Sequence, residues 1–112
     1  MTHSEYLDKV QPFFERDFDI NETLWLLQNT NQSVYMSWGV TDIKHFPPHG
    51  LMFWTNGHHH VGWCLVTLAW NDTYTYRLFN QDWTTKRLVM GVWLYRQAAC
   101  DMTSAALAAA SS

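Results

Sequence analysis

The chain has 112 residues, of which 47% are apolar and 16% aromatic, and its formal net charge at pH 7 is −3. This length fits one domain spanning residues 1–112, and the apolar share is enough for a hydrophobic core, so two domains and a globally disordered chain are excluded. Only seven Lys and Arg residues are scattered along the sequence, which argues against binding driven by nucleic-acid phosphates.

No basic stretch followed by an apolar run opens the sequence, and no run of about 18 apolar residues occurs in it. We therefore expect neither a secretory signal nor a membrane span. The two cysteines, Cys64 and Cys100, are expected to be buried reduced thiols rather than parts of a disulfide framework. These features favour a cytoplasmic protein, either in a bacterium or in a host cell.

Two short helices are predicted in the first part of the chain. Residues 4–10 carry an apolar stripe at helical spacing, and Pro12 ends or bends this helix. Asp19 or Asn21 can cap a second helix, which ends at the polar turn residues 29–32. This part of the chain is acidic, which indicates either a solvated helix with its caps or a docking surface for a basic partner. Its acidic residues are Glu5, Asp8, Glu15, Asp17, Asp19 and Glu22.

Four strands are predicted next, because β-branched and aromatic residues alternate with polar ones between turn residues. The prolines in residues 45–50 predict a loop between the first two strands. Asn56-Gly57 favours a two-residue hairpin turn that needs positive φ at both positions. That turn would place His58 opposite Thr55 and His60 opposite Phe53. The predicted strands span residues 33–41, 51–55, 58–70 and 73–79.

A C-terminal helix is predicted over residues 87–107, because apolar residues recur there at helical spacing. The tail, residues 105–112, is rich in Ala and Ser and low in complexity. The predicted fold class is therefore α+β: a single antiparallel four-stranded meander sheet packed on one face by the N-terminal and C-terminal helices.

A set of short segments forms a recognisable pattern along the chain: Thr23-Leu24-Trp25-Leu26-Leu27, Tyr35-Met36, Leu51-Met52-Phe53, Val66-Thr67-Leu68, Asp72-Thr73-Tyr74 and Gly91-Val92-Trp93. This pattern resembles small accessory proteins of phages and other bacterial mobile elements. The most specific part of the pattern is a strand ending in Thr-Leu that is followed shortly by Asp-Thr-Tyr. The family has no assigned activity, so the resemblance implies a mobile-element accessory role and no functional residue.

Histidines are the candidate metal ligands. His58 and His60 would share one face of a strand, and His49 or His45 in the proline loop could be a third ligand for Zn²⁺, Ni²⁺ or Cu²⁺. The alternatives are an exposed His-rich hairpin tip, or a tip that senses pH or contacts a partner. No cysteine pair or HExxH helix supports a metal site, so no metal or other cofactor is predicted.

No catalytic residue is predicted. Cys64 could be combined on paper with a histidine and Asp72, but a cysteine in the middle of a predicted strand is expected to be a core thiol. The chain also lacks the GxGxxG and GxxxxGK loops that bind phosphates.

Aromatic residues around the two hairpins are the candidate interaction residues. They either fill the core or leave an exposed platform. A platform with few neighbouring cations suits a protein partner or self-association better than stacked single-stranded bases. The set is Trp54, Trp63, Trp70, Tyr74, Tyr76 and Trp83.

These observations predict a non-enzymatic interaction factor from a phage or mobile element that binds and modulates a host protein, such as an inhibitor of a bacterial defence system. A histidine-based metal-binding protein or metal-dependent enzyme is the alternative, and a single-stranded nucleic-acid binder is a further one.

Overall fold

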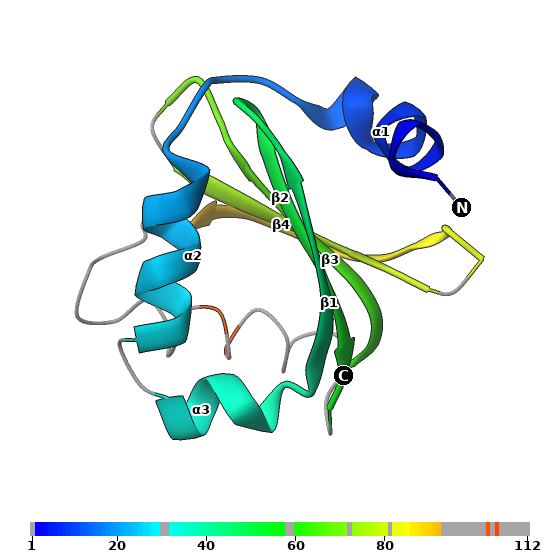
Figure 1. Cartoon of the computed structure of the whole chain (residues 1–112). Helices are drawn as coiled ribbons and strands as arrows, with labels where there is room; N and C mark the ends of the chain where they lie inside the picture. The colour runs from blue at the N-terminus through cyan, green and yellow to red at the C-terminus, as the bar shows by residue number, and fades with distance from the viewer. Residues whose placement is uncertain are drawn as a thin grey trace.

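The protein is described from a computed structural model, which covers residues 2–29, 32–57, 60–71, 73–80, 82–92, 103 and 105. Three helices come first and five strands follow (Figure 1). The helical elements are α1 (His3–Val10), the 3-10 helix η1 (Gln11–Phe13), α2 (Ile20–Asn29) and α3 (Gln32–Ser37). The strands are β1 (Val40–Phe46), β2 (Gly50–Asn56), β3 (Val61–Leu68), β4 (Tyr74–Phe79) and β5 (Thr85–Val92).

The strands form one antiparallel sheet in the order β1-β2-β3-β4-β5, so each strand pairs with its neighbour in sequence. This confirms the predicted α+β class and the antiparallel meander, which comprises β1 to β4. The fifth strand extends the meander by one edge strand. Short connections between consecutive strands explain this topology, because antiparallel neighbours need only a tight turn.

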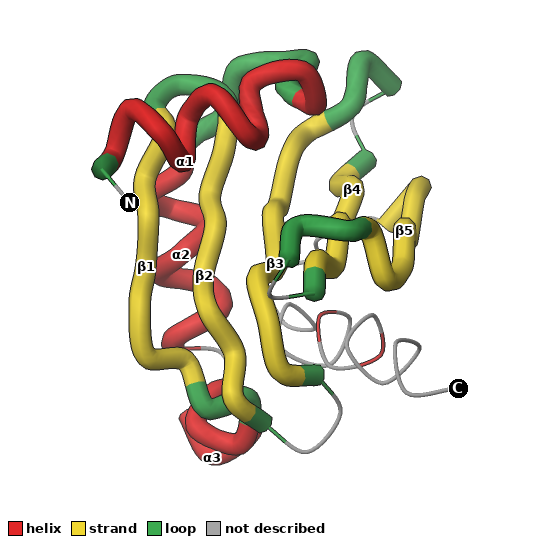
Figure 2. The backbone as a smooth tube through the Cα atoms, turned by 90° about the vertical axis from the view of Figure 1, so that its right-hand side faces the viewer, coloured by secondary structure: helices red, strands yellow, loops and turns green. Residues whose placement is uncertain are grey.

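The sheet is covered on both faces (Figure 2). α1 lies against one face, and α2 and α3 lie against the other. The prediction had placed all helices on one face. Every residue of β3 after Val61 is buried, because both faces of this strand are covered. A strand buried on both sides is mostly apolar instead of alternating between apolar and polar residues, and the sequence of β3 has this character. The core on the α2 face includes Leu27, Trp38, Leu51, Phe53, Cys64, Val66, Tyr76 and Leu78. The core on the α1 face includes Val10, Phe46, Met52, Trp63, Leu65 and Phe79.

The first two predicted helices are confirmed as α1 and α2. α1 begins one residue earlier than predicted, because Thr2 caps it: the Thr2 hydroxyl accepts a hydrogen bond from the Glu5 N–H at 3.3 Å. α2 is capped by Asp19, whose carboxylate accepts from the Glu22 N–H at 3.0 Å.

The predicted strand 33–41 is wrong for most of its length. Residues 32–37 form α3, and β1 begins only at Val40 and continues through His45 to Phe46. Gly39, with φ of 63°, separates helix from strand. Apolar residues spaced two apart in this short segment fit either element, and the left-handed glycine after residue 37 decides for a helix that ends there.

The hairpin between β2 and β3 also differs from the prediction. Asn56 pairs with Val61 and Thr55 pairs with Gly62, so the connection is longer than two residues and His60 does not face Phe53. The Thr55 hydroxyl donates to the carbonyl oxygens of His60 and Gly62 at 3.2 and 3.1 Å. The Gly57 N–H donates to the His60 carbonyl. These bonds stabilise the wider loop in place of a two-residue turn.

The predicted helix 87–107 is wrong at its start, where β5 spans Thr85–Val92 and pairs with β4. Thr85, Val89 and Val92 are β-branched, and such residues favour an edge strand over a helix. Residues 93–102, which include Cys100, lie outside the described residues. Thr103 and Ala105 are helical, and the Thr103 hydroxyl lies 2.9 Å from the Tyr76 hydroxyl in the buried α2-face core.

Candidate functional site

The predicted histidine ligands do not come together. His49 lies in the turn between β1 and β2, whereas His60 lies in the loop between β2 and β3. These connections are at opposite ends of β2, which has seven residues, so about 20 Å separates them. His58 lies outside the described residues. Within the described ranges, no group of three His, Cys, Asp or Glu residues could hold a metal ion.

Among the predicted ligands, His49 and His60 each contact neighbouring side chains or backbone, and His45 lies in β1. The His49 Nδ1 is 2.9 Å from the Asp17 carboxylate, and its ring stacks on Phe14 with centroids 5.7 Å apart. His60 is buried, and its Nε2 lies 3.3 Å from the carbonyl oxygen of Trp63. His60 therefore belongs to the packing of the hairpin end and is not on an accessible tip.

Cys64 is fully buried in the α2-face core and is a free thiol. Burial raises the pKa of the Cys64 thiol far above its usual value, because the thiolate would lose its hydration. A nucleophilic cysteine needs the opposite shift, so this environment is that of a core side chain.

The predicted aromatic residues divide into buried, partly buried and exposed ones. Trp63 and Tyr76 are buried on opposite faces of the sheet, which removes both from the predicted interaction surface. Strand alternation and the pairing of both β3 and β4 inside the sheet cause this burial. Trp54, Tyr74 and Trp83 are partly buried. Trp70, in the turn between β3 and β4, is 74% exposed.

The partly buried Trp54 and Trp83 are held by aromatic packing on the α1 face. Trp63 stacks on Trp83 with centroids 6.0 Å apart, and it meets Trp54 and Tyr6 edge to face at 5.2 Å. Such pairs add to the stabilisation from buried area. Trp54, Trp63 and Trp83, three of the six predicted interaction residues, therefore take part in core packing.

Trp83 sits in a tight turn with a backbone conformation that is unfavourable for a residue with a Cβ. Its φ is 69°, and its N–H donates to the Asn80 carbonyl at 3.0 Å. The Asp82 carboxylate accepts from the Thr84 N–H and hydroxyl at 3.1 and 2.6 Å, and these bonds lower the pKa of Asp82. The turn thus folds the indole back onto the sheet at a cost in backbone strain.

Replacing Trp83 should separate the strain from the stacking. Both Trp83→Ala and Trp83→Gly should destabilise the protein, but the glycine variant should be more stable than the alanine variant by about 1 kcal/mol, because only alanine keeps the strained left-handed Cβ. Urea unfolding followed by circular dichroism measures this difference. At Trp70, which is not among the described residues with positive φ, alanine should be the more stable of the two. The same order at both positions would contradict this conformation of Trp83.

The segment that joins η1 to α2, residues 14–19, crosses the end of the sheet from one face to the other (Figure 1). We call it the crossing segment. The Arg16 N–H donates to the Leu68 carbonyl at the end of β3, and the Phe18 N–H donates to the Pro48 carbonyl in the β1–β2 turn, both at 3.0 Å. The Phe18 ring meets Tyr74 edge to face at 5.8 Å. The crossing segment is thereby fixed against two hairpins.

Trp70 lies in the connection between β3 and β4, where hydrogen bonds join residues on either side of it. The Ala69 N–H donates to the Thr73 carbonyl at 2.8 Å. The Asn71 side-chain oxygen accepts from the Thr73 hydroxyl at 2.6 Å and from the Thr73 N–H at 3.3 Å. Thr73, which makes these bonds, is buried. Trp70 is therefore exposed between two residues, Ala69 and Asn71, that hydrogen bonds tie to Thr73.

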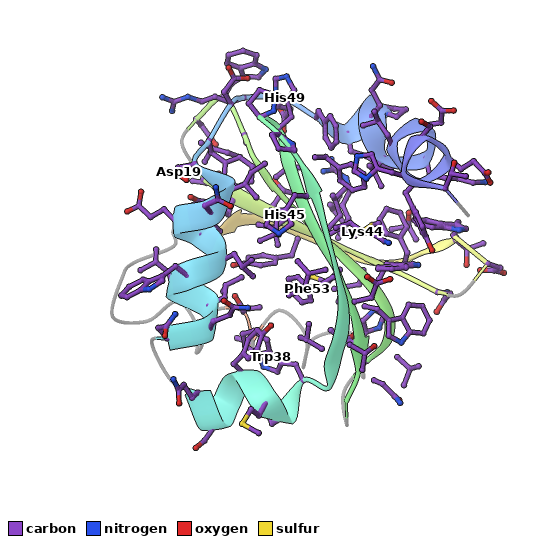
Figure 3. The ribbon with its side chains drawn as sticks, in the orientation of Figure 1. Asp19, Trp38, Lys44, His45, His49 and Phe53 are labelled. Carbon is purple, nitrogen blue, oxygen red and sulfur yellow. The ribbon has the colours of Figure 1, made fainter. Side chains whose placement is uncertain are left out.

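Together these residues form the sheet-end surface, which we define as Arg16, Asp17, Asp19, Pro48 and Trp70. All five are exposed. Figure 3 shows Asp19 and His49 at this same end of the molecule, away from Trp38 and Phe53 in the α2-face core. Sequence reasoning identified Trp70 but missed this surface as a unit. The flanking pair Phe14 and Phe18 was the available signal that residues 14–19 are anchored at both ends.

Glu15, within the crossing segment, interacts electrostatically with Arg77 on β4. Arg77 on β4 lies over the Phe13 ring at 4.7 Å and donates to the Thr67 hydroxyl at 3.3 Å. Partial burial lowers the pKa of Arg77, and the charge of Glu15 opposes that shift. Glu15 therefore helps to balance a half-buried guanidinium, whereas Asp17 and Asp19 belong to the sheet-end surface.

Comparisons with family models, with curated proteins and with solved structures found no match for this chain. Among the described residues, no helix has the length and apolar character needed to cross a membrane.

Proposed function

We propose that the protein acts by contact with another protein and that Trp70 is the centre of that contact. The observation that carries this proposal is the 74% exposure of Trp70 on a turn fixed by hydrogen bonds. Tryptophan is enriched among the residues that dominate binding energy at protein interfaces. The remaining aromatic residues of the sequence prediction are buried or partly buried, so Trp70 is the member most accessible to a partner.

The biological setting we propose follows from the sequence resemblance. An accessory protein of a phage or mobile element would bind and modulate a bacterial host protein in the host cytoplasm, for example as an inhibitor of a defence system. A small chain with an exposed tryptophan and a net charge of −3 suits such a role, because tryptophan is enriched among the residues that dominate binding at protein interfaces. Neither the metal-binding nor the single-stranded nucleic-acid alternative is favoured by a specific arrangement among the described residues.

Affinity capture from a bacterial lysate tests this proposal. The wild-type chain should recover one dominant protein, and Trp70→Ala should lose it, because an interface tryptophan contributes about 2 kcal/mol or more. The matched control is Trp25→Ala: Trp25 is 50% exposed on α2 and lies outside the sheet-end surface. Circular dichroism should show that both variants keep the fold. Equal capture by the Trp70→Ala variant and the wild type would refute the proposal.

A further inference from the structure

β1 is an edge strand, and no other strand of the described part of the chain lies along its outer side. It forms the opposite edge of the sheet from β5 (Figure 2). Among the described residues, its backbone hydrogen bonds go to β2 and to the turn that follows β1. An edge strand presents a row of backbone N–H and C=O groups that can pair with a further strand. The outer side of β1 is therefore open to strand addition.

The side chains of β1 are only partly covered by the layers on the two faces of the sheet. Ile43 packs against the α2-face core and remains partly buried. On the other face, the Lys44 Nζ lies 4.9 Å from the centre of the Tyr6 ring and 3.5 Å from the Asp42 carboxylate. The side chains of Lys44 and Asp42 are 27% and 45% exposed. Figure 3 shows Lys44 and His45 on opposite sides of the strand. An added strand would thus meet an isoleucine on one face and two opposite charges on the other.

The charges of β1 discriminate between the strands that could be added. A lysine on an edge disfavours most strands, because its ammonium would lose water without gaining a counter-ion. A second copy of β1, antiparallel to the first about a twofold axis at Ile43, supplies that counter-ion. Asp42 of each copy then lies opposite Lys44 of the other, and the two Ile43 side chains lie opposite each other.

This alignment is also the one that the strand itself favours. A twofold axis at Asp42 or at Lys44 would place two like charges opposite each other, which destabilises a strand pair. The central pairs of the alignment at Ile43 lie within the regular part of β1, since its register with β2 shifts between Val40 and Asp42. Charge complementarity therefore selects one occupant and one register.

We propose that the protein forms a dimer in which β1 pairs with β1 of a second copy, so that two five-stranded sheets become one continuous sheet. The interface is isologous, because both copies contribute the same residues, and it closes after two copies. The dimer does not rest on the proposed function, because Trp70 lies in the connection between β3 and β4. Since the contact is one strand wide, we expect the dimer to dissociate on dilution.

Sedimentation velocity over about a hundredfold range of protein concentration tests this proposal. The wild-type chain should shift from 13.2 kDa towards twice that mass as the concentration rises, and no larger species should form. Asp42→Lys and Lys44→Asp should each weaken association about tenfold or more, because each places like charges opposite each other at two symmetry-related pairs. The matched control is Asp8→Lys, which makes the same change of charge at an exposed position of α1 and should leave the dimer unchanged. Circular dichroism should show that all variants keep the fold.

Mixing the two charge variants gives the sharpest result. Asp42→Lys alone has two cations on each β1, and Lys44→Asp alone has two anions, so each should be monomeric where the wild type is dimeric. In an equimolar mixture every cation lies opposite an anion, and the dimer should return. The double variant Asp42→Lys/Lys44→Asp, which has the net charge of the wild type, should dimerise by itself.

Three outcomes would overturn the dimer. A wild-type chain that stays monomeric at every concentration would leave this edge to a strand of a different protein. An Asp42→Lys variant that dimerises like the wild type would place the interface on a different surface. A mixture that stays monomeric would exclude the pairing of Asp42 with Lys44 across the twofold axis.

Discussion

Gly62→Ala should lower the free energy of unfolding by about 3–5 kcal/mol, a large part of the stability of a typical small protein. Gly62 lies in β3 with φ of 150°, and a Cβ at this position would be 2.1 Å from the carbonyl oxygen of Phe79 on the neighbouring strand. The His60 ring lies on it as well, with ring atoms 3.1 and 3.2 Å from that Cβ. Because the nearest atom belongs to the backbone of the sheet, the clash cannot be relieved by a change of rotamer. Urea unfolding monitored by tryptophan fluorescence measures the loss.

Gly50→Ala is the matched control. A Cβ on Gly50 would meet the Phe14 ring, with the nearest atom at 2.6 Å, and a half-buried side chain can move where a paired backbone cannot. We therefore expect a smaller loss, about 1 kcal/mol. Wild-type stability of the Gly62→Ala variant would be incompatible with the pairing of β3 and β4 described above.

The second large effect is expected at Trp63, with Trp70 as its comparison. Trp63→Ala should cost about 3–5 kcal/mol, because this buried indole packs against Tyr6, Trp54 and Trp83 and its removal leaves a cavity. Trp70→Ala should change stability by less than about 0.5 kcal/mol, because most of this side chain is already in water. Chemical denaturation of the two variants under the same conditions measures both values.

The opposite order of stability would mean that the two tryptophans exchange core and surface positions, and both the fold and the proposed contact site would then be wrong. The expected order also makes Trp70→Ala suitable for binding experiments, since a loss of binding could not be attributed to unfolding.

The parts of the fold that the sequence predicted depend on local chemistry. A capping aspartate at residue 19 and an apolar stripe in residues 4–10 were enough to locate α2 and α1. The strands β2, β3 and β4 were found because long apolar and β-branched runs are separated by turn residues. The class α+β followed from these elements alone.

The parts that sequence reasoning missed depend on contacts between distant segments or on short ambiguous patterns. The period of residues 33–38 fits a helix or a strand, and only the backbone conformation of Gly39 decides between them. β5 was assigned to a helix because Leu88 and Val92, four residues apart, fit both periods. The second covered face could have been inferred from the apolar run in β3, which leaves no polar side for solvent.

The candidate site shows the same division. Trp70 was predicted because a tryptophan next to the turn residues Asn71-Asp72 belongs to a hairpin end. Asp17 and Asp19 were noticed only as part of an acidic segment. Their position at the end of the sheet depends on the bond between Arg16 and Leu68, and neither composition nor spacing indicates such a long-range pair.

The bond from Arg16 to Leu68 also has a consequence for synthesis on the ribosome. The crossing segment is translated before Leu68, its partner at the end of β3. The α1 layer cannot take its final position until that strand has left the exit tunnel, so the usual advantage of early folding at the N-terminus is lost. The first-made helices must wait, with their apolar stripes available to chaperones, for the later hairpins on which they dock.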